Sequence, residues 1–393
     1  MHKKGDLYDD PANPDNKYFN ITVSYDPNGP FFQPLIYSST QTIQVLNKAS
    51  DYYCSVIRYN IPLDFLPVTI FPVVANTNLL SLSNTSTIRI GIMNFTTGIS
   101  YELPLQYENA STLFPKPLQN QTVQVVTPYY YIYSYYKMIT LINNGLQAVF
   151  NLFAAANPAD PRVVNGGNPL PAPFFTFDSE TSLIKLITFN TWIQPLQLPP
   201  TPKTGVFIYI NTEGINFLDA FTYFSIMTSP LNLNFFFVIE NRGDNGYPTN
   251  TFPALPDYIY QTQSYSTIGN WQSIKKLLIT TNTIPVVNEN LPLIGNVNLD
   301  QSNSLSILSD FLPQINSTVL SNPRENAIYY PTSQYRLIDM ISDLPLRKID
   351  LAVYWQDKDN NVYPVFISQF SSASIKLAFV KKSLYKGGML LMK

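Results

Sequence analysis

Side chains that could carry catalysis at neutral pH are scarce in this chain of 393 residues, which holds one histidine, His2, and one cysteine, Cys54. General acid–base catalysis most often uses histidine, and a serine or cysteine nucleophile needs such a base beside it. A structural zinc site with four cysteine or histidine ligands cannot be assembled from one residue of each type, and neither can a disulfide within the chain. The sequence therefore predicts no enzyme, no metal site and no cofactor.

Carboxylates could still form a site by themselves. The pairs Asp9/Asp10 and Asp357/Asp359 lack the spacing of a calcium-binding loop, so a polar segment and a turn are the better interpretations. A glycosidase built on two facing acids stays open as an alternative, because the sequence does not give the separation of its carboxylates. Cys54 lies in an apolar, strand-like run, which favours a buried and inert thiol.

Two short polar segments could bind something outside the chain. The tripeptide Arg242-Gly243-Asp244 follows an apolar strand and is a candidate host-attachment loop, and the alternative is an ordinary hairpin turn. Lys381 and Lys382 begin a basic segment near the C-terminus. Contacts with nucleic-acid phosphates are one interpretation of that segment, and a solvated tail is the favoured one.

The composition predicts strands and loops. The chain contains 27 Tyr, 25 Phe, 3 Trp and 32 Pro, and 13% of its residues are charged. Tyrosine and phenylalanine favour strands, whereas proline breaks helices and keeps strands short. Because interface cores are poor in charge and rich in aromatics, such a composition suits a subunit that neighbours cover. A net charge of −2 gives no global attraction to nucleic acid or to an anionic membrane.

Targeting signals and membrane spans are not expected from the residue pattern. No run of about 18 apolar residues is present, so the sequence predicts no transmembrane helix. The polar N-terminal segment lacks the apolar core of a secretory signal, which indicates synthesis in a cytosol.

Periodicity predicts the elements that would position any site. Residues 41–46 alternate polar and apolar, as in a half-buried strand, and residues 87–95 and 100–105 form a hairpin around Gly98. Residues 135–153 carry apolar side chains at steps of three and four, which predicts an amphipathic helix that packs in a core.

Many short antiparallel strands with long connections predict an all-β dominated fold. We expect a single antiparallel jelly roll, an eight-stranded sandwich, with a large inserted second domain that contains at least one helix. An insertion is expected because single cores stop growing near about 250 to 300 residues. The expected boundaries are a flexible N-terminal arm over 1–17, a shell domain over 18–130 and 257–393, and the insertion over 131–256.

Several dispersed segments together resemble one protein family, the penton or minor capsid proteins of virophages and polinton-like viruses. The segments that carry the resemblance are residues 51–62, the helix around 138–150, residues 173–178, residues 271–289 and residues 347–355. The resemblance extends from about Tyr18 to Tyr385, and the order of the segments is more specific than any one of them.

The resemblance implies a structural role in a double-stranded DNA virus. A jelly roll of this family stands in the capsid shell and forms homopentamers at the icosahedral vertices, beside trimers of a double-jelly-roll major capsid protein. The insertion would face outward, where a vertex fibre or a host receptor could bind. Packaged DNA could contact the basic C-terminal segment. The protein would be synthesised in the host cytoplasm and located in the virion.

Candidate residues for contacts between subunits are aromatic, and their alternative role is ordinary core packing. They are Tyr52, Tyr53, Tyr129, Tyr130, Tyr131, Tyr133 and Trp355. The rival function is a jelly-roll carbohydrate-binding or receptor-binding head used in host attachment. In that case exposed Trp192 and Trp271 would stack on sugar rings.

Overall fold

The computed structural model divides the chain into two units, one of which is inserted into the other. Unit 1 consists of Met1–Leu66 and Ile274–Lys393, and unit 2 consists of Pro67–Ser273. The structure describes residues 2–10, 13–29, 33–63, 65–72, 85–106, 129–193, 204–229, 232–240, 251–252, 255–287, 290–291, 305–312, 326–329, 336–358, 360–369, 371–386 and 389–390. Unit 2 is therefore wider than the insertion expected at 131–256.

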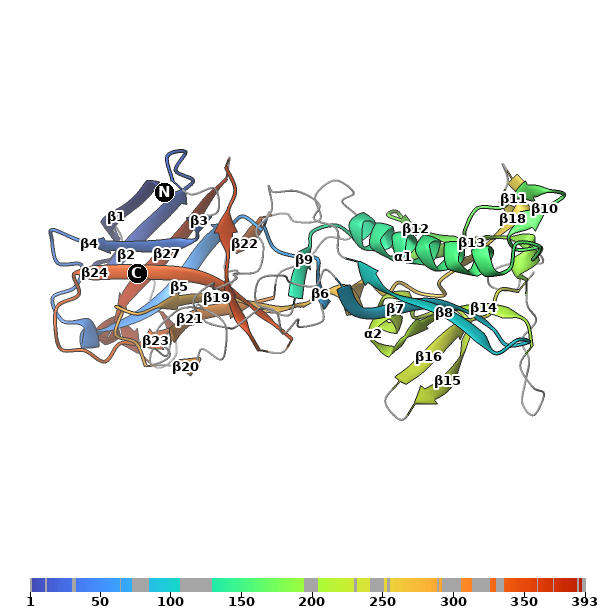
Figure 1. Ribbon diagram of the computed structural model, residues 1–393. Helices are drawn as coiled ribbons and strands as arrows, with labels where there is room; N and C mark the ends of the chain where they lie inside the picture. Colours follow the sequence, from blue (N-terminus) through green and yellow to red (C-terminus); the bar gives the residue numbers. More distant parts are fainter. Residues whose placement is uncertain are drawn as a thin grey trace, which may run out of the picture. The chain divides into compact units, whose positions relative to one another are not determined.

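Unit 1 contains two antiparallel sheets (Figure 1). The first has the order β1-β2-β27-β5-β22, with β23 also paired to β5, and the second has the order β20-β21-β19-β24-β25, with β4 also paired to β24. The strands are β1 (His2–Asp10), β2 (Asn13–Ser24), β4 (Ile36–Thr40), β5 (Tyr52–Ile61), β19 (Ile274–Thr281), β20 (Asn290–Leu291), β21 (Leu305–Phe311), β22 (Ala327–Tyr329), β23 (Ile338–Asp339), β24 (Lys348–Asp357), β25 (Val362–Pro364) and β27 (Ser372–Lys381). The short strands β3 (Gln33–Pro34) and β26 (Phe366–Ile367) pair with each other, as do β28 (Tyr385–Lys386) and β29 (Met389–Leu390).

The connections between these strands follow a jelly roll. In chain order, β2, β5, β22 and β27 lie in one sheet, and β4, β19, β21 and β24 lie in the other, so the chain crosses repeatedly between them. Aromatic pairs join the two sheets: Phe19 of β2 lies 6.1 Å from Tyr37 of β4, and Tyr59 of β5 stacks on Phe311 of β21 at 4.3 Å, measured between ring centroids. The chain leaves unit 1 after β5 and returns at β19, so unit 2 interrupts a single sandwich.

The N-terminal segment is a correction to the sequence-based expectation. Residues 1–17 were expected to form a flexible arm, but β1 pairs with β2, and β2 pairs with β27. The segment is poor in apolar residues because β1 lies at the edge of its sheet, where Lys3, Lys4 and Asp6 are tolerated and discourage further strand pairing. Backbone pairing with β2 and the contact between the rings of Tyr8 and Tyr18, whose centroids lie 5.5 Å apart, hold this strand.

Unit 2 combines sheets with a long helix, which confirms the helix expected over 135–153. One sheet has the order β15-β16-β14-β7-β8, and another has the order β12-β13-β18-β17. The elements are β6 (Thr69–Pro72), β7 (Thr85–Asn94), β8 (Ile99–Gln106), β9 (Tyr129–Ile132), α1 (Tyr135–Ala156), β10 (Val164–Asn165), β11 (Asn168–Pro169), β12 (Phe174–Asp178), β13 (Leu183–Phe189), β14 (Val206–Asn211), α2 (Thr212–Leu218), β15 (Tyr223–Ser229), β16 (Asn232–Phe237), β17 (Thr251–Phe252), β18 (Leu255–Thr262) and α3 (Ile268–Trp271). β6 and β9 pair with each other, and so do β10 and β11.

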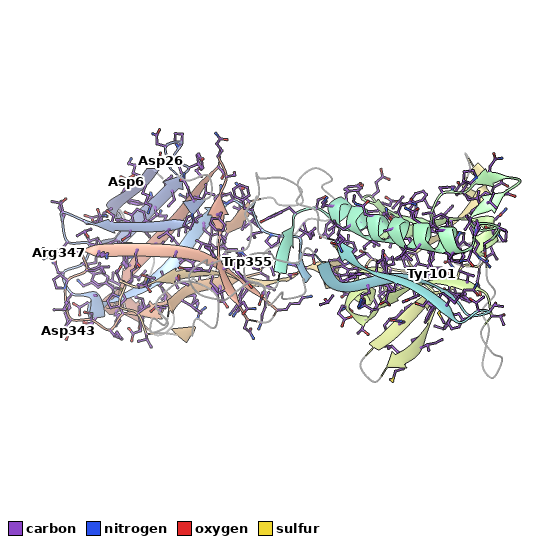
Figure 2. All side chains as sticks on the ribbon, in the orientation of Figure 1. Asp6, Asp26, Tyr101, Asp343, Arg347 and Trp355 are labelled. Atoms are coloured by element: carbon purple, nitrogen blue, oxygen red, sulfur yellow. The ribbon has the colours of Figure 1, made fainter. Side chains whose placement is uncertain are left out.

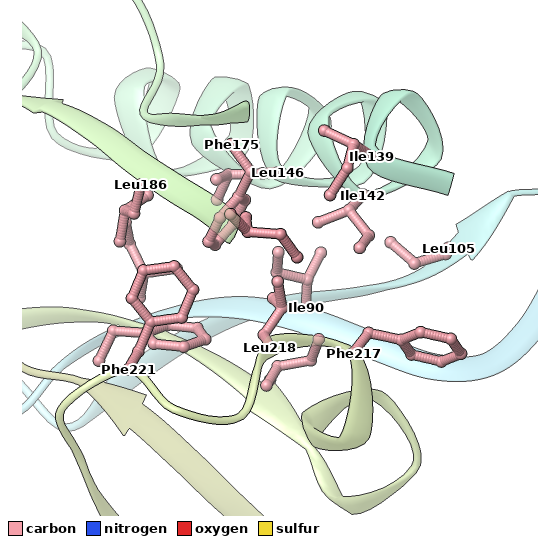
Figure 3. Close-up of a cluster of buried hydrophobic side chains, with 14 of the residues drawn as sticks. Ile90, Leu105, Ile139, Ile142, Leu146, Phe175, Leu186, Phe217, Leu218 and Phe221 are labelled. Carbon is pink, nitrogen blue, oxygen red and sulfur yellow. The ribbon is translucent and has the colours of Figure 1, made fainter. Parts of the chain in front are cut away.

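The apolar stripe of α1 packs into the main core of unit 2 (Figure 3). Ile139, Ile142 and Leu146 of the helix lie over Ile90 of β7 and Leu105 of β8, all at most 4% exposed. By length and composition α1 could cross a membrane, and it is the one helix in the described part of the chain that could. Because its apolar residues fill this core, α1 is a core helix.

A polar pair fixes α1 against the second sheet. Asn143 donates from Nδ2 to the carbonyl oxygen of Phe175 at 2.8 Å and accepts from the Phe175 N–H at 2.7 Å. Phe175 belongs to β12, an edge strand, so the amide of Asn143 satisfies backbone groups that would otherwise lack a strand partner.

Candidate functional site

An exposed apolar patch lies on loops at one end of unit 1. Backbone hydrogen bonds join the loop before β5 to the loop before β24, from the N–H of Ala49 to the oxygen of Leu344 at 3.3 Å, and another joins the N–H of Ile341 to the oxygen of Pro285 at 2.9 Å. The end patch consists of Ile43, Val287, Ile341 and Leu344, which are 76%, 51%, 63% and 74% exposed. Exposed large apolar side chains gathered on adjoining loops are typical of a surface that another protein covers.

An ion pair lies on the same loops as the end patch. Lys48 Nζ lies 3.2 Å from Asp343 Oδ1, and the Ser50 hydroxyl also donates to this carboxylate. These hydrogen bonds, from Ser50 and then Lys48, lower the pKa of Asp343 below its ordinary value. Asp343 and Arg347 lie at this end of unit 1 in Figure 2. Exposed apolar side chains next to charged groups are also found at protein–protein interfaces.

Three of the expected interface aromatics can be placed in unit 1. Tyr52 and Tyr53 are half-buried at the start of β5, and Lys382 Nζ lies 5.4 Å above the ring of Tyr53. Trp355 is a correction: it is 2% exposed and stacks on Tyr363 with 4.4 Å between ring centroids. It is a core residue because the second half of β24 is buried on both faces.

For most of the other candidate interface and attachment residues, the structure does not describe the side chains. Tyr129, Tyr130 and Tyr131 pair through their backbones with β6, but their side chains lie outside the described residues. Tyr133 is half-buried just before α1. The tripeptide at 242–244 also lies outside the described residues, so its role as a host-attachment loop stays a prediction.

Two lysines of the basic C-terminal segment are paired with acids. Lys381 lies 2.9 Å from Asp15, and Lys382 forms an ion pair with Asp339 and donates to the oxygen of Met340 at 3.1 Å. Carboxylates therefore already neutralise these two ammonium groups, which makes them weak phosphate-binding groups. The contact with packaged DNA stays an untested prediction.

Groups considered for catalysis are placed in structural roles where the structure describes them. Cys54 is fully buried, as expected from its apolar strand, and burial raises the pKa of its thiol to about 12. Asp357 accepts hydrogen bonds from the Asn361 N–H at 2.8 Å and from the Tyr363 hydroxyl at 3.3 Å, which holds the turn after β24. Within the described ranges, no three His, Cys, Asp or Glu side chains gather as metal ligands do.

A pocket on the outer face of the β15-β16-β14-β7-β8 sheet was missed from the sequence. Along β7, Ile88, Ile90 and Ile92 point into the core, so the intervening Arg89 and Met93 point to the other face. The outer-face pocket has a volume of about 350 Å³ and is lined by Arg89, Met93, Phe95, Ser100, Glu102, Tyr209, Asn211, Ile226, Asn234 and Phe236. The alternation of apolar and polar residues along each strand indicates which side chains share a face. The sequence does not show that these strands are neighbours in one sheet.

A hydrogen-bond network joins three strands across the outer-face pocket. Arg89 Nε lies 2.8 Å from Glu102 Oε1, and the Tyr209 hydroxyl donates to Glu102 Oε2 at 3.0 Å. The hydroxyl of Ser100 lies 2.8 Å from that of Tyr209. Burial, followed by the nearby Glu102 carboxylate, raises the pKa of Tyr209 above its ordinary value, so its hydroxyl stays protonated. The polar side chains are thus held in place by one another.

The tryptophans proposed to stack on sugars are corrections, because both lie in the core of unit 2. Trp192 is 0% exposed and Trp271 is 1% exposed. The indole N–H of Trp271 donates to the oxygen of Phe217 at 3.2 Å, and its ring packs edge-to-face on the ring of Tyr135 at 5.5 Å. Large apolar rings such as these are readily buried, and aromatic content alone does not reveal this.

Comparisons with known proteins place most of the chain in one family. The family described as Sputnik minor capsid protein V18/19 matches residues 17–381. The structural protein V19 of Sputnik virophage is 31% identical over 215 residues, covering 54% of this chain and 95% of the relative. A second relative from Sputnik virophage, the uncharacterized protein V18, is 30% identical over 169 residues, covering 41% of this chain and 92% of the relative.

Solved structures agree with this assignment. A chain of the 3.5 Å cryo-EM structure of the Sputnik virophage matches with a TM-score of 0.70 and 28% identity, covering 95% of this chain and 100% of the other. The crystal structure of the mavirus penton protein matches with a TM-score of 0.59 and 16% identity, covering 93% and 99%, and at that identity the likeness concerns the fold alone. The chain therefore belongs to the Sputnik minor capsid protein V18/19 family, and its role is that of a structural capsid protein.

Proposed function

We propose that this minor capsid protein forms homopentamers at the vertices of an icosahedral virophage-type capsid and contacts trimers of the major capsid protein there. The observation that carries the proposal is the jelly roll of unit 1, in a chain whose family match covers residues 17–381. The fold neighbour named as a penton protein supports the vertex position. A ring of five uses one patch on each subunit against a different patch on the next.

The end patch supplies a surface for such contacts. Ile43 and Leu344 are 76% and 74% exposed in the single chain, and covering them would remove apolar area from water. The chain enters and leaves unit 2 at the opposite end of β5 and β19 from this patch. In our proposal the end patch contacts neighbouring capsid subunits, and unit 2 faces outward, where a vertex fibre or a host receptor could bind.

The chain is proposed to act without catalysis and to be synthesised in the host cytoplasm before it enters the virion. Support for a non-enzymatic role comes from the structural relatives, from the hydrogen-bonded carboxylate of Asp357 and from the buried thiol of Cys54. The rival function, a carbohydrate-binding or receptor-binding head, is favoured by one specific observation, the outer-face pocket of unit 2. The two functions are compatible because they use different units.

Oligomeric state tests the vertex proposal. We would measure the purified chain by mass photometry and negative-stain imaging, alone and with the major capsid protein of the same virus. Five-fold rings, alone or at the vertices of co-assembled particles, are expected. A stable dimer or trimer, or particles whose vertices exclude the chain, would contradict the proposal.

A pair of matched variants tests the end patch. Leu344→Glu is expected to reduce ring formation or incorporation into particles, because a charge would be buried in the contact. Met227→Glu is the control, since Met227 is 68% exposed but lies in unit 2. Equal incorporation of the two variants would show that the end patch is not a contact.

A further inference from the structure

We infer that the outer-face pocket of unit 2 binds a neutral saccharide. The inference concerns unit 2 only and stands independently of the proposed vertex role. It rests on four properties of the pocket: its apolar floor, its ordered polar wall, its compensated charge and its size.

The floor of the pocket is aromatic and rigid. Tyr209 and Phe236 are each 2% exposed, their ring centroids lie 4.9 Å apart, and Phe224 stacks on Phe236 at 5.2 Å. Phe95, the residue that follows β7, packs against Phe236 with 5.1 Å between ring centroids. The apolar surface offered to the C–H face of a pyranose is that of Met93, Phe95 and Ile226, which are half-buried in the lining and pack on these rings. Little entropy is lost on binding because the buried rings beneath them are already ordered.

The wall of the pocket presents both donors and acceptors in fixed positions. Glu102 is held by Arg89 and by the Tyr209 hydroxyl, and Asn211 accepts from the Arg89 N–H at 2.9 Å and donates to the oxygen of Thr87 at 2.9 Å. Asn234, 7% exposed, adds an amide to the lining. Sugar hydroxyls donate and accept at once, so a polyol can match such a mixed wall.

The charges of the pocket select against ionic ligands. The one guanidinium of the lining, that of Arg89, is paired with its one carboxylate, that of Glu102. A phosphate or an acidic sugar would have to compete with Glu102, and a cation would have to compete with Arg89. A purely apolar ligand would bury the polar wall without partners, which is costly. A neutral ligand avoids the competition with the Arg89–Glu102 pair, and a polar one supplies hydrogen-bond partners to the wall.

The volume and position of the pocket also favour a small ligand over a peptide strand. A cavity of about 350 Å³ is at the lower end of the range for small-molecule sites. The lining includes side chains of β14 and β7, which are inner strands of the sheet, so the pocket lies on a sheet face. Peptides that bind by strand addition need a sheet edge instead.

Saturation-transfer NMR and calorimetry on the full chain test this inference. The probes are the methyl glycosides of glucose, mannose, galactose and N-acetylglucosamine, with lactose and maltose, and N-acetylneuraminic acid as the anionic comparison. At least one neutral probe is expected to bind with a dissociation constant of about a millimolar, typical of a small polar ligand. Glu102→Gln and Tyr209→Phe are expected to weaken its binding about tenfold, because each removes a hydrogen bond of the wall.

Further variants keep the test independent of folding. Ser100→Trp places a large ring at an exposed position of the lining and is expected to abolish binding without unfolding the chain. Glu180→Gln, an exposed carboxylate in the turn after β12, is the control and is expected to bind as the unmodified chain does. The melting temperature of every variant would be recorded alongside.

Three results would overturn the inference. The first is that no neutral probe binds at about 20 mM, a concentration well above the expected dissociation constant. The second is that a neutral probe binds but Glu102→Gln and Ser100→Trp leave its affinity unchanged. The third is that only the anionic sugar binds. Mass photometry of the same samples separates the two proposals. If the chain forms five-fold rings but binds no sugar, the saccharide proposal fails and the vertex proposal stands. If the chain binds a sugar but forms a stable dimer or trimer, the vertex proposal fails and the saccharide proposal stands.

Discussion

The ring of Tyr209 lies over the backbone of Gly91, its cross-strand partner in the pairing of β14 with β7. A Cβ atom at Gly91 would overlap the Cζ, Cε1 and hydroxyl oxygen of Tyr209. Gly91 therefore leaves room for the ring and sets the position of the hydroxyl that reaches Glu102 and Ser100. A single missing side chain on one strand shapes the floor of the outer-face pocket.

Replacing Gly91 by alanine should destabilise unit 2. The added methyl group would displace the Tyr209 ring, and overpacking of this kind costs about 1–3 kcal/mol. Thermal unfolding of the full chain followed by circular dichroism measures the loss. Gly269→Ala is the matched control, because nothing lies within 4 Å of a Cβ at that position. Equal stability of the two variants would refute the steric role of Gly91.

Truncating Trp271 should be among the most damaging single changes in unit 2. The side chain is 1% exposed and packs against Phe217 at 5.1 Å and Tyr135 at 5.5 Å between ring centroids. Trp271→Ala should lower the free energy of unfolding by about 3–5 kcal/mol, since it opens a large cavity. Leu152→Ala, at a position of α1 that is 47% exposed, should change it by less than about 0.5 kcal/mol. Denaturant titration of both variants provides the comparison.

Asp350 should stabilise the turn after β19 in unit 1. Its carboxylate accepts from the Thr283 N–H at 2.8 Å, the Thr281 hydroxyl at 2.6 Å and the Asn282 N–H at 3.0 Å. Asp350→Ala should cost about 2–3 kcal/mol, because the donors lose a charged acceptor. Asp350→Asn keeps one acceptor oxygen and should cost less. If both changes leave the unfolding free energy unaltered, the carboxylate does not hold this turn.

Alkaline pH should destabilise unit 1 through Cys54. Burial raises the pKa of its thiol from an ordinary 9.0 to about 12 in the folded chain. The unfolded thiol ionises first as the pH rises, so the associated stability is complete below about pH 9 and is lost between pH 9 and 12. Burial also raises the pKa of Tyr59, so its ionisation at alkaline pH lowers the free energy of unfolding as well.

Cys54→Ala isolates the contribution of the thiol. The variant should lose less unfolding free energy between pH 8 and 11 than the unmodified chain does, since the contribution of the thiol is then absent. Thiol labelling at pH 8 provides a second measurement. The folded chain should resist the reagent and the unfolded chain should react. Rapid labelling of the folded chain would contradict the buried position of Cys54.

The local sequence pattern predicted individual helices and strands better than it predicted which strands pair in the same sheet. The helix expected over 135–153 is α1, because its apolar steps are set by the helix itself, and the hairpin expected at 87–95 and 100–105 is β7 with β8. The hairpin was assigned to the shell, however, and it belongs to unit 2, where β14 pairs with β7. Alternation shows that a strand has a buried face, but it does not show which sheet the strand joins.

The functional surfaces were harder to predict for the same reason. The residues of the outer-face pocket are adjacent only because β8, β7, β14, β16 and β15 are neighbours in one sheet. Trp192, Trp271 and Trp355 were chosen for their chemistry, yet their size and apolar area make them core residues. Exposed aliphatic residues such as Leu344 carry no sequence signal, since only their position in the fold exposes them.

The pairing of β27 between β2 and β5 orders events during synthesis. The ribosome completes unit 2 at residue 273, whereas the central strand of the first shell sheet is Ser372–Lys381. Domains generally fold as units as they emerge, so unit 2 can fold while the shell still lacks that strand. A prematurely terminated chain would thus combine a folded unit 2 with a sandwich that lacks β27. The first sheet of unit 1 can therefore close only after residue 381 has been synthesised, an order of events that the topology sets.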